Sequence, residues 1–281
     1  MVIIDFHTHI FPPDVISKRG TYLAQEEWFA HLYGSTNARM ATAGNLVEEM
    51  DRCGISKAVV CGFAWNSFDL YVETNSYIAD AVSRFPERLV GFANIPPLHP
   101  NATMELERCL DLGLKGIGEL KPDGQEFDLV DEIGMQPLSA LAAENGLPML
   151  IHLSEPVGRT YPGKGRTSPR KGYEFALQHP DLKLVYAHWG GGLPFYELMP
   201  DVKKALTNVY YDCSASPFLY ESRIYRTAID SVGYRKILFG SDFPLISPER
   251  YMKELDEANI NMDEREAIMG GNASSFLGEV G

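Results

Sequence analysis

The chain has 281 residues, of which 45% are hydrophobic and 22% charged, a balance typical of a soluble globular protein. Its formal net charge is −13 at pH 7, which opposes binding to nucleic acid, because affinity for phosphates comes largely from lysine and arginine. The four cysteines form no CxxC pair, so we expect reduced structural thiols and a fold that needs no disulfide.

The N-terminus begins directly with a strand-like run and lacks the charged and apolar regions of a signal peptide. No apolar run is long enough to cross a membrane. We therefore expect a cytoplasmic protein without membrane contact.

Short runs rich in Val, Ile, Leu and Phe recur along the chain, each followed by a loop and a stretch of helical period. These runs predict eight strands, over residues 2–6, 58–63, 89–94, 115–120, 148–153, 183–187, 209–213 and 236–240. Stretches of helical period lie between them, among others at residues 44–55, 72–85, 101–113 and 136–146.

Alternating strands and helices predict a parallel sheet, and eight such units favour a single (β/α)8 TIM barrel over an open doubly wound sheet. The long first interval leaves room for an insertion at residues 12–42, after the first strand, and the chain closes on C-terminal helices. No linker is evident, so we expect one domain over residues 1–281.

Chemically reactive residues occur where these strands end. In a TIM barrel the active site forms at the carboxyl ends of the strands, and four of the seven histidines fall there. The strand ends with a histidine or a carboxylate read 5-DFHTH-9, 116-GIGEL-120, 149-MLIHLSE-155, 184-LVYAHWG-190 and 237-ILFGSDFP-244. We place His99 and His179, each followed by proline, in surface turns, and leave His31 unassigned.

His7 and His9 are two residues apart on an extended strand, so both side chains point to one face and can bind one cation. With His152 and Asp242 at other strand ends, they predict a divalent metal site. Imidazole and carboxylate ligands suit zinc first, and also manganese, iron or cobalt. The absence of cysteine from the group argues for a catalytic site rather than a closed structural one.

These motifs resemble the amidohydrolase superfamily. The DFHTH of the first strand, the single histidines of strands five and six and the GSDFP of strand eight carry the resemblance. The closer likeness is to the amidohydrolase-related (amidohydrolase 2) branch, which includes aminocarboxymuconate-semialdehyde decarboxylase, γ-resorcylate decarboxylase and pyrone-dicarboxylate lactonase. The closing 263-DEREAIMGGNASSFLG-278 resembles that branch's C-terminal helix, so the likeness spans nearly the whole chain.

The resemblance implies that His7, His9 and His152 bind the metal, and that Asp242 approaches the metal and takes a proton from its water. His188 is implied to be catalytic, either as an electrophile that polarises the substrate or as a further group beside the ion. The resemblance also implies a small-molecule substrate and a possible homodimer.

The fourth strand departs from the superfamily's two-metal enzymes, which carry a carboxylated lysine there. Here Glu119 has the parity of an inward residue, and we favour it as a metal ligand over a carbamate on Lys121. The alternative is that Glu119 hydrogen-bonds a ligand histidine without touching the metal. One or two ions therefore fit the sequence.

Substrate contacts are expected from the loop after the fifth strand and from aromatic residues at strand exits. Arg159, Lys164 or Arg166 could clamp a substrate carboxylate. Trp65 and Trp189 could form aromatic walls, and the early insertion could fold over the barrel mouth.

The leading functional hypothesis is a hydrolase that attacks an ester, lactone or amide of a small acidic compound with metal-activated water, Asp242 being the general base. The alternative is a metal-dependent nonoxidative decarboxylase of an aromatic or unsaturated carboxylic acid. A nuclease of the TatD kind shares the ligand types, but the acidic balance disfavours it. A barrel that keeps a metal without turnover is the non-enzymatic hypothesis.

Overall fold

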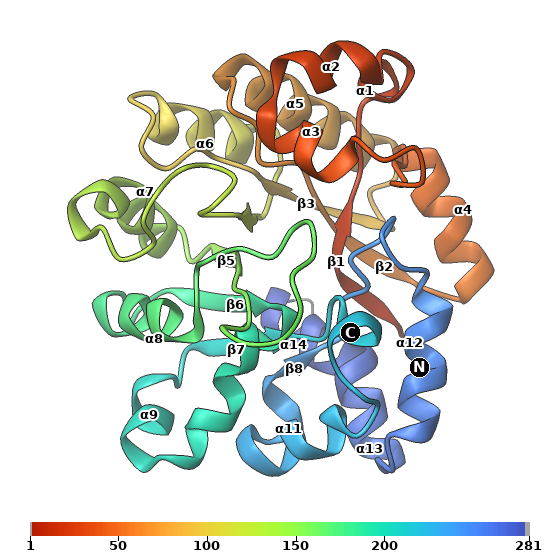
Figure 1. The fold of residues 1–281 in the computed structure, drawn as a ribbon, viewed down its shortest axis with the longest axis vertical. Helices are drawn as coiled ribbons and strands as arrows, with labels where there is room; N and C mark the ends of the chain where they lie inside the picture. Colours follow the sequence, from red (N-terminus) through yellow and green to blue (C-terminus); the bar gives the residue numbers. More distant parts are fainter. Residues whose placement is uncertain (1, 279–281) are drawn as a thin grey trace.

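The computed structural model describes residues 2–278. Within that range, eight parallel strands form one sheet in which each strand lies beside the next along the chain (Figure 1). The strands are β1 (Ile4–His9), β2 (Lys57–Cys61), β3 (Leu89–Ala93), β4 (Gly116–Leu120), β5 (Pro148–His152), β6 (Lys183–Ala187), β7 (Val209–Asp212) and β8 (Ile237–Leu238).

The sheet closes on itself between β1 and the segment that follows β8. The Phe6 N–H donates to the Phe239 carbonyl at 2.7 Å, and the His9 N–H donates to the Phe243 carbonyl at 2.7 Å. This closure confirms the predicted (β/α)8 TIM barrel.

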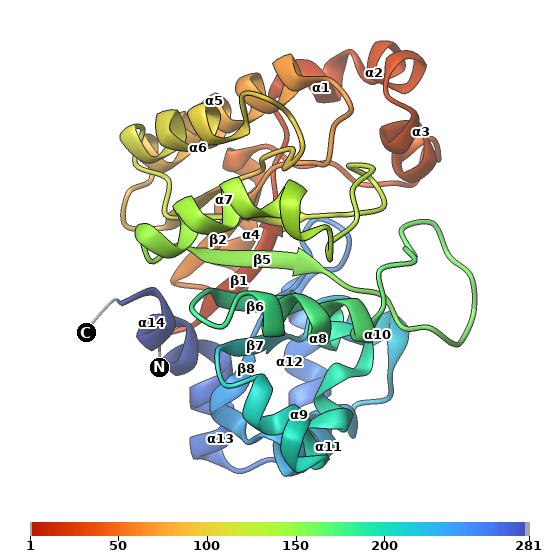
Figure 2. The ribbon, with the colours of Figure 1, turned by 90° about the vertical axis from the view of Figure 1, so that its left-hand side faces the viewer.

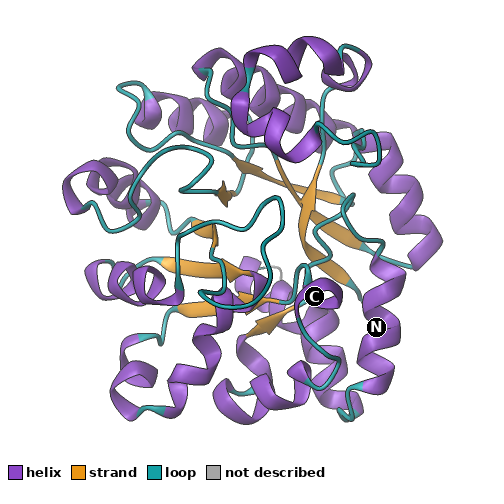
Figure 3. Ribbon diagram, viewed as in Figure 1, coloured by secondary structure: helices purple, strands orange, loops and turns teal. Residues whose placement is uncertain are grey.

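Helices surround the barrel and return the chain from one strand to the next (Figure 3). They are α4 (Ala43–Cys53), α5 (Phe68–Arg84), α6 (Ala102–Asp111), α7 (Glu132–Glu144), α8 (Pro169–Gln178), α9 (Pro200–Ala205), α10 (Ser216–Leu219), α11 (Ile224–Val232) and α12 (Pro248–Glu257). At the expected C-terminal helix, the chain forms α13 (Met262–Glu266), a π-helical turn (Ala267–Gly271) and α14 (Asn272–Leu277).

The early insertion folds as α1 (Pro13–Ser17), α2 (Arg19–Gln25) and α3 (Glu27–Tyr33). An aromatic core joins it to the barrel, where Phe29 lies with Phe11, Phe63 and Trp65. Figure 2 shows these helices on the same side of the molecule as the long loop after β5, opposite α14. The insertion therefore belongs to the face onto which the strands open.

The barrel interior is apolar at its amino end. Ile4, Phe6 and Leu150 pack there, and the Phe276 ring of α14 lies 5.6 Å from the Phe6 ring. The buried side chains of His7, Glu119, His152 and His188 lie toward the opposite end, which is where the sequence places the site.

A β-bulge in β1 changes which side chains face the barrel interior. Three residue steps from Asp5 to Thr8 pair with two steps from Ala58 to Val60 on β2. The alternation is shifted by one residue, so Phe6 packs in the core and His7 and His9 follow it at the mouth.

A second irregularity in β4 aims Glu119. Ile117 pairs with Met149 and Leu120 with Ile151, so β4 again has one residue more than its neighbour. Gly118 has a φ of +139°, and a Cβ at this position would lie 2.6 Å from the Leu150 carbonyl oxygen. The positive φ and the close approach to Leu150 both require glycine at position 118, next to Glu119.

Several expectations about individual segments need correction. β1 extends to His9 and β8 is limited to two residues. The prediction that His179 lies in a surface turn is wrong: the residue is only 9% exposed, and its ring lies 4.5 Å from that of Phe175. The cysteines are free thiols, as predicted, and Cys53 is the least buried of them. No helix among the described residues is long and apolar enough to cross a membrane.

Candidate metal centre and active site

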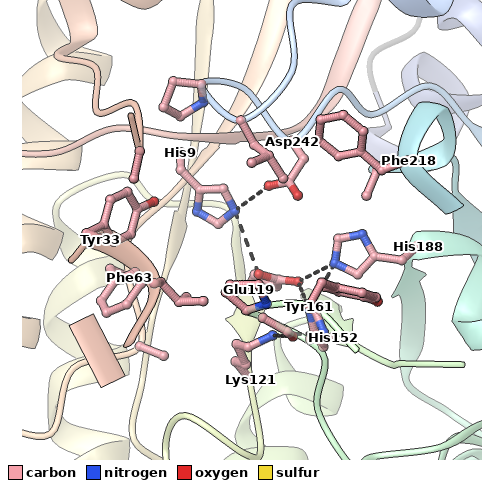
Figure 4. A pocket seen from close by; sticks show the side chains of 18 of the residues that line it. His9, Tyr33, Phe63, Glu119, Lys121, His152, Tyr161, His188, Phe218 and Asp242 are labelled. Atoms are coloured by element: carbon pink, nitrogen blue, oxygen red, sulfur yellow. Dashed lines mark hydrogen bonds and ion pairs between the residues drawn. The ribbon is translucent and has the colours of Figure 1, made fainter. Parts of the chain in front are cut away.

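Six predicted side chains meet at the carboxyl end of the barrel in two groups, and Figure 4 labels all of them except His7. His7, His9 and Asp242 form the first group, and Glu119, His152 and His188 form the second. In each group, one ligand atom from every residue lies within 4.8 Å of the others. The structure thus places His152 beside Glu119 and His188, rather than directly with His7 and His9.

The imidazoles of His7 and His9 are oriented by their Nδ1 atoms. His7 Nδ1 lies 2.7 Å from Asp212 Oδ2, and His9 Nδ1 lies 2.9 Å from the Gly62 carbonyl oxygen. Both oxygens accept hydrogen bonds, so each Nδ1 carries a proton and the neutral ring has its lone pair on Nε2.

The two Nε2 atoms face one another at 3.0 Å. Two lone pairs at that distance repel unless a proton on one ring or a metal ion lies between them. Nitrogens about 2.1 Å from one ion would be about this far apart. Asp242 Oδ1 lies 3.4 Å from His9 Nε2 and 3.9 Å from His7 Nε2. The donor set therefore fits a divalent metal.

Glu119 connects the two groups. Its Oε2 lies 3.8 Å from His7 Nε2 and 3.7 Å from His9 Nε2. Its Oε1 lies 2.9 Å from His152 Nδ1 and 3.3 Å from His188 Nε2. One carboxylate oxygen thus faces each group, an arrangement that could bridge two ions.

The charge distribution at the site is strongly polarised. Burial opposes ionisation of Glu119, but His152 and His7 outweigh it and hold the pKa of this carboxyl well below its usual range. Burial also opposes a charge on His7, yet Asp212 and Glu119 raise its pKa well above the ordinary value. The pKa of Asp242 is lowered despite burial, chiefly by its hydrogen bond with His9. Ionised carboxylates in a buried site require a compensating positive charge.

His188 and Asp242 both occupy the left-handed backbone region, with φ of +58° and +57°. Gly190, Gly191 and Gly192 continue this conformation after His188. The His188 N–H donates to Asp212 Oδ1 at 2.9 Å, and the Asp242 N–H donates to the His7 carbonyl at 2.8 Å. Such strain persists where surrounding contacts support it, and it is commonest at functional sites.

Asp212, which ends β7 and is fully buried, was not among the residues predicted from the sequence. It contacts His7 and His188 and accepts a short hydrogen bond from the Ser214 hydroxyl. A carboxylate at the end of the seventh predicted strand was the signal that could have identified it.

Lys121 is also at the site. Its Nζ lies 2.8 Å from His152 Nε2 and donates to the Gly163 carbonyl at 2.8 Å. An ammonium can only donate, so His152 Nε2 accepts and His152 Nδ1 carries the ring proton toward Glu119. Burial and the Lys121 charge lower the pKa of His152 to about 3, and burial lowers that of Lys121 to about 8.

A cavity of about 370 Å³ opens above the two groups. Its floor is polar, with His9, Glu119, His152, His188 and Asp242. Its walls include aromatic side chains from the insertion, from the loops that follow β2 and β5, and from α10: Tyr33, Phe63, Tyr161 and Phe218 (Figure 4). Its cationic residues are Arg39, Lys121 and Arg159.

The predicted substrate residues are only partly found at this cavity. Arg159 lines it and donates to the Phe218 carbonyl at 3.0 Å. Lys164 does not line it, because its ammonium pairs with Glu155 at 3.2 Å within the loop. Arg166 is turned outward, with its side chain 98% exposed.

Both predicted tryptophans lie away from the cavity. Trp65 is 1% exposed in the aromatic core under the insertion, and Trp189 is fully buried, with its Nε1–H donating to Ser216 Oγ at 3.1 Å. We therefore correct the expectation that they form substrate walls. Arg39, from the insertion, was missed because an exposed arginine in an irregular segment carries no distinctive sequence pattern.

Histidines and carboxylates at the carboxyl end of an eight-stranded barrel define a class of metal-dependent TIM-barrel enzymes. A family model described as amidohydrolase matches residues 4–278. The chain therefore belongs to the amidohydrolase family, as its motifs predicted.

Curated relatives include 2-amino-3-carboxymuconate-6-semialdehyde decarboxylase of Dictyostelium discoideum, which is 25% identical over 98% of this chain and 91% of the relative. The γ-resorcylate decarboxylase of a Polaromonas strain is 25% identical over 72% of this chain and 74% of the relative. A dihydroxybenzoic acid decarboxylase from Polaromonas, solved with bound manganese and an inhibitor, has the same fold, with a TM-score of 0.75, 18% identity and coverage of 99% and 97% of the two chains.

Proposed function

We propose that this protein is a metal-dependent nonoxidative decarboxylase of a small aromatic or unsaturated carboxylic acid. The observation that carries the proposal is the cavity, in which aromatic walls and cationic residues stand over a metal-binding floor. The decarboxylases among its relatives support it. It replaces hydrolysis, the leading hypothesis from sequence, with the alternative.

His7, His9 and Asp242 would hold the ion, with Glu119 as a further ligand between the two groups. A divalent ion there would supply Lewis acidity, polarising a substrate oxygen so that negative charge can develop on the ring or chain. The ligand types fit zinc and manganese alike, and the manganese-bound relative supports manganese. We retain both metals in the proposal.

Loss of carbon dioxide breaks a carbon–carbon bond, and the carbon that remains must take up one proton. His188 is suited to supply it. Its Nδ1 lies 2.8 Å from Ser214 Oγ, whose own proton points to Asp212, so Nδ1 is a donor and the titrating proton resides on Nε2. Burial lowers the pKa of His188, but Glu119 and the other nearby carboxylates raise it above its usual value overall.

The cavity walls would hold a planar acid and exclude water from it. Phe63 is 6% exposed, while Phe218 is 42% exposed at the rim. Arg39 and Arg159 would attract the anionic substrate to the opening. We therefore propose both Arg159 and Arg39 as substrate-binding residues.

Hydrolysis remains a second candidate because of one observation, the position of Glu119 between two potential ion sites. Two ions bridged by a carboxylate are suited to activating water. A second ion would occupy His188 Nε2, whereas a single ion would leave this atom free to carry a proton. The metal count therefore separates the two reactions.

The test combines metal analysis with product analysis. We would load the purified protein with manganese or zinc and measure ions per chain. We would then incubate it with hydroxybenzoic and unsaturated dicarboxylic acids, and with lactones and esters. We expect one ion per chain and one carbon dioxide released per acid consumed. Two ions, with cleavage of lactones or esters in their place, would reject decarboxylation and support hydrolysis.

His188→Gln provides the matched variant for this reaction. We expect it to bind the metal normally and to release carbon dioxide at least 100-fold more slowly, because a general acid contributes about this much. Unchanged turnover would show that the proton comes from another group. The state of association, for which a homodimer is our proposal, can be measured on the same samples by light scattering.

A further inference from the structure

Lys121 is a buried cation at the floor of the cavity. It follows β4, two residues after Glu119, and it is 6% exposed while lining the cavity. Figure 4 shows its side chain lying beside His152 below the aromatic walls. Burying an ammonium is costly unless an opposite charge compensates it.

The groups that contact this ammonium directly are all uncharged; burial lowers its pKa, and the more distant carboxylates of Glu119, Asp123 and Asp242 offset only part of that effect. Nζ contacts His152 Nε2 and the Gly163 carbonyl, each at 2.8 Å, and lies 5.4 Å from the centre of the Trp28 ring. Among the described residues, no carboxylate oxygen lies within the 4.0 Å of an ion pair. An ammonium has three donors, so one N–H is left without a partner in the protein.

Other shielded lysines of this chain do have such partners. Lys236 pairs with both oxygens of Glu197 at 2.8 Å, and Lys164 pairs with Glu155 at 3.2 Å. The missing partner is therefore specific to the one shielded lysine that lines the cavity. An anionic group of a bound ligand would supply the missing partner of the Lys121 ammonium.

We propose that Lys121 binds the carboxylate of the substrate and thereby selects anionic acids over their neutral amides. This inference rests on the proposed function for the identity of the site. The third N–H would donate to a carboxylate oxygen, and the buried position would make the contact stronger than an exposed ion pair. Trp28, from the insertion, shields the ammonium from water on its other side.

The two arginines of the cavity fit a different role. Arg39 and Arg159 are exposed to solvent, where ion pairs contribute little to affinity. They would guide anions toward the opening, while Lys121 would distinguish them once bound. The tight contact is thus assigned to the lysine.

The experiment measures binding of benzoate and of its neutral isostere benzamide to the metal-loaded protein by calorimetry. We expect the wild type to prefer benzoate, and Lys121→Met to bind benzoate about tenfold more weakly with benzamide affinity unchanged within twofold. Lys121→Gln keeps a hydrogen-bond donor without the charge and serves if the Met variant fails to fold. Lys115→Met, immediately before the amino end of β4, is the matched control and should bind both ligands as the wild type does.

Three results would overturn the inference. These are an unchanged benzoate affinity in the folded Lys121 variants, an equal loss for both ligands, and a wild type that binds benzoate no better than benzamide. None depends on turnover. If the protein released no carbon dioxide from any acid, the proposed function would fail while the binding data still decided the role of Lys121.

Discussion

Asp212 shows how one residue outside the candidate ligand set can orient several groups at the site. It lies under the metal centre, accepts hydrogen bonds from His188 and Ser214, and fixes the His7 ring through Nδ1. By fixing the tautomer, it directs the His7 lone pair toward the ion. Burial raises the pKa of Asp212, but the neighbouring His7 charge outweighs that and lowers it.

We expect Asp212→Asn to weaken metal binding about 10- to 100-fold, because the amide can donate to Nδ1 and stabilise the wrong tautomer. Competition titration with a chelating indicator would measure this. Asp230→Asn, at an exposed ion pair with Arg226, is the control. Equal metal affinity in both variants would contradict the orienting role.

Glu254 on α12 is a partly buried carboxyl whose Oε2 has no hydrogen-bond partner within the described chain. Burial raises its pKa to about 7. A carboxyl with a raised folded-state pKa does not destabilise the fold below its unfolded pKa, where it is protonated in both states. The destabilisation grows as pH rises from the unfolded pKa to the folded pKa, and it stays constant above the folded pKa.

Glu254→Gln should therefore raise the melting temperature relative to the wild type at pH 8, by roughly 2 °C, and by less at pH 5. Thermal unfolding at both pH values measures the difference. Glu266→Gln, at an exposed position, should show no such pH dependence. A gain of equal size at both pH values would mean that ionisation of Glu254 is not its cause.

At the scale of elements, the extra residues in β1 and β4 decide which side chains reach the site. The HxH pattern correctly placed His7 and His9 on one face, but regular alternation from Phe6 would have turned them away from the interior. In β4, an extra residue next to Glu119 likewise interrupts the alternation of inward-facing and outward-facing side chains. Bulges depend on pairing with the neighbouring strand, so one strand's sequence does not reveal them.

Gly118→Ala tests the irregularity in β4. The added Cβ would meet the Leu150 carbonyl at 2.6 Å, so we expect a loss of about 2 kcal/mol or more in unfolding free energy, together with weaker metal binding. Gly146→Ala is the control, because Gly146 also has a positive φ, of +61°, but its Cβ would meet nothing within 4 Å.

Denaturant unfolding of both variants measures the contrast. In the Gly146→Ala control, the unfolding free energy should fall by about 1 kcal/mol, which is the cost of an alanine in the left-handed backbone conformation. Equal losses would show that the close approach to Leu150 is relieved by a small backbone shift.

For the whole molecule, metal binding and stability should be coupled. The candidate ligands come from both ends of the chain, Asp242 after β8 and His7 on β1, so an ion would link the segments that close the barrel. Ligands that bind only the folded state stabilise it by mass action.

Removing the metal with a chelator should therefore lower the melting temperature by roughly 5 °C or more, and manganese or zinc should restore it. The matched variant is His7→Ala with His9→Ala, which should melt at the same temperature with and without added metal. A metal-dependent shift in this variant would place the stabilising ion elsewhere.

The order of elements was readable from the sequence because it depends on local chemistry. Buried parallel strands are continuous apolar runs, and the helices between them have their own period, so eight strands were found at nearly the observed positions. The chemical residues were found because they stand at strand exits, and Glu119, His152 and His188 lie where that rule predicts.

Only the tertiary structure decided the contacts between these segments. In the structure, His152 lies beside Glu119, and Trp65 and Trp189 are buried in the interior. Lys164 forms an ion pair with Glu155 of its own loop. The structure also revealed Asp212 beneath His7, and it showed that the direct contacts of the Lys121 ammonium are with uncharged groups. Sequence determines which side chains a strand can present, whereas partners distant in the chain decide burial, tautomer and charge compensation.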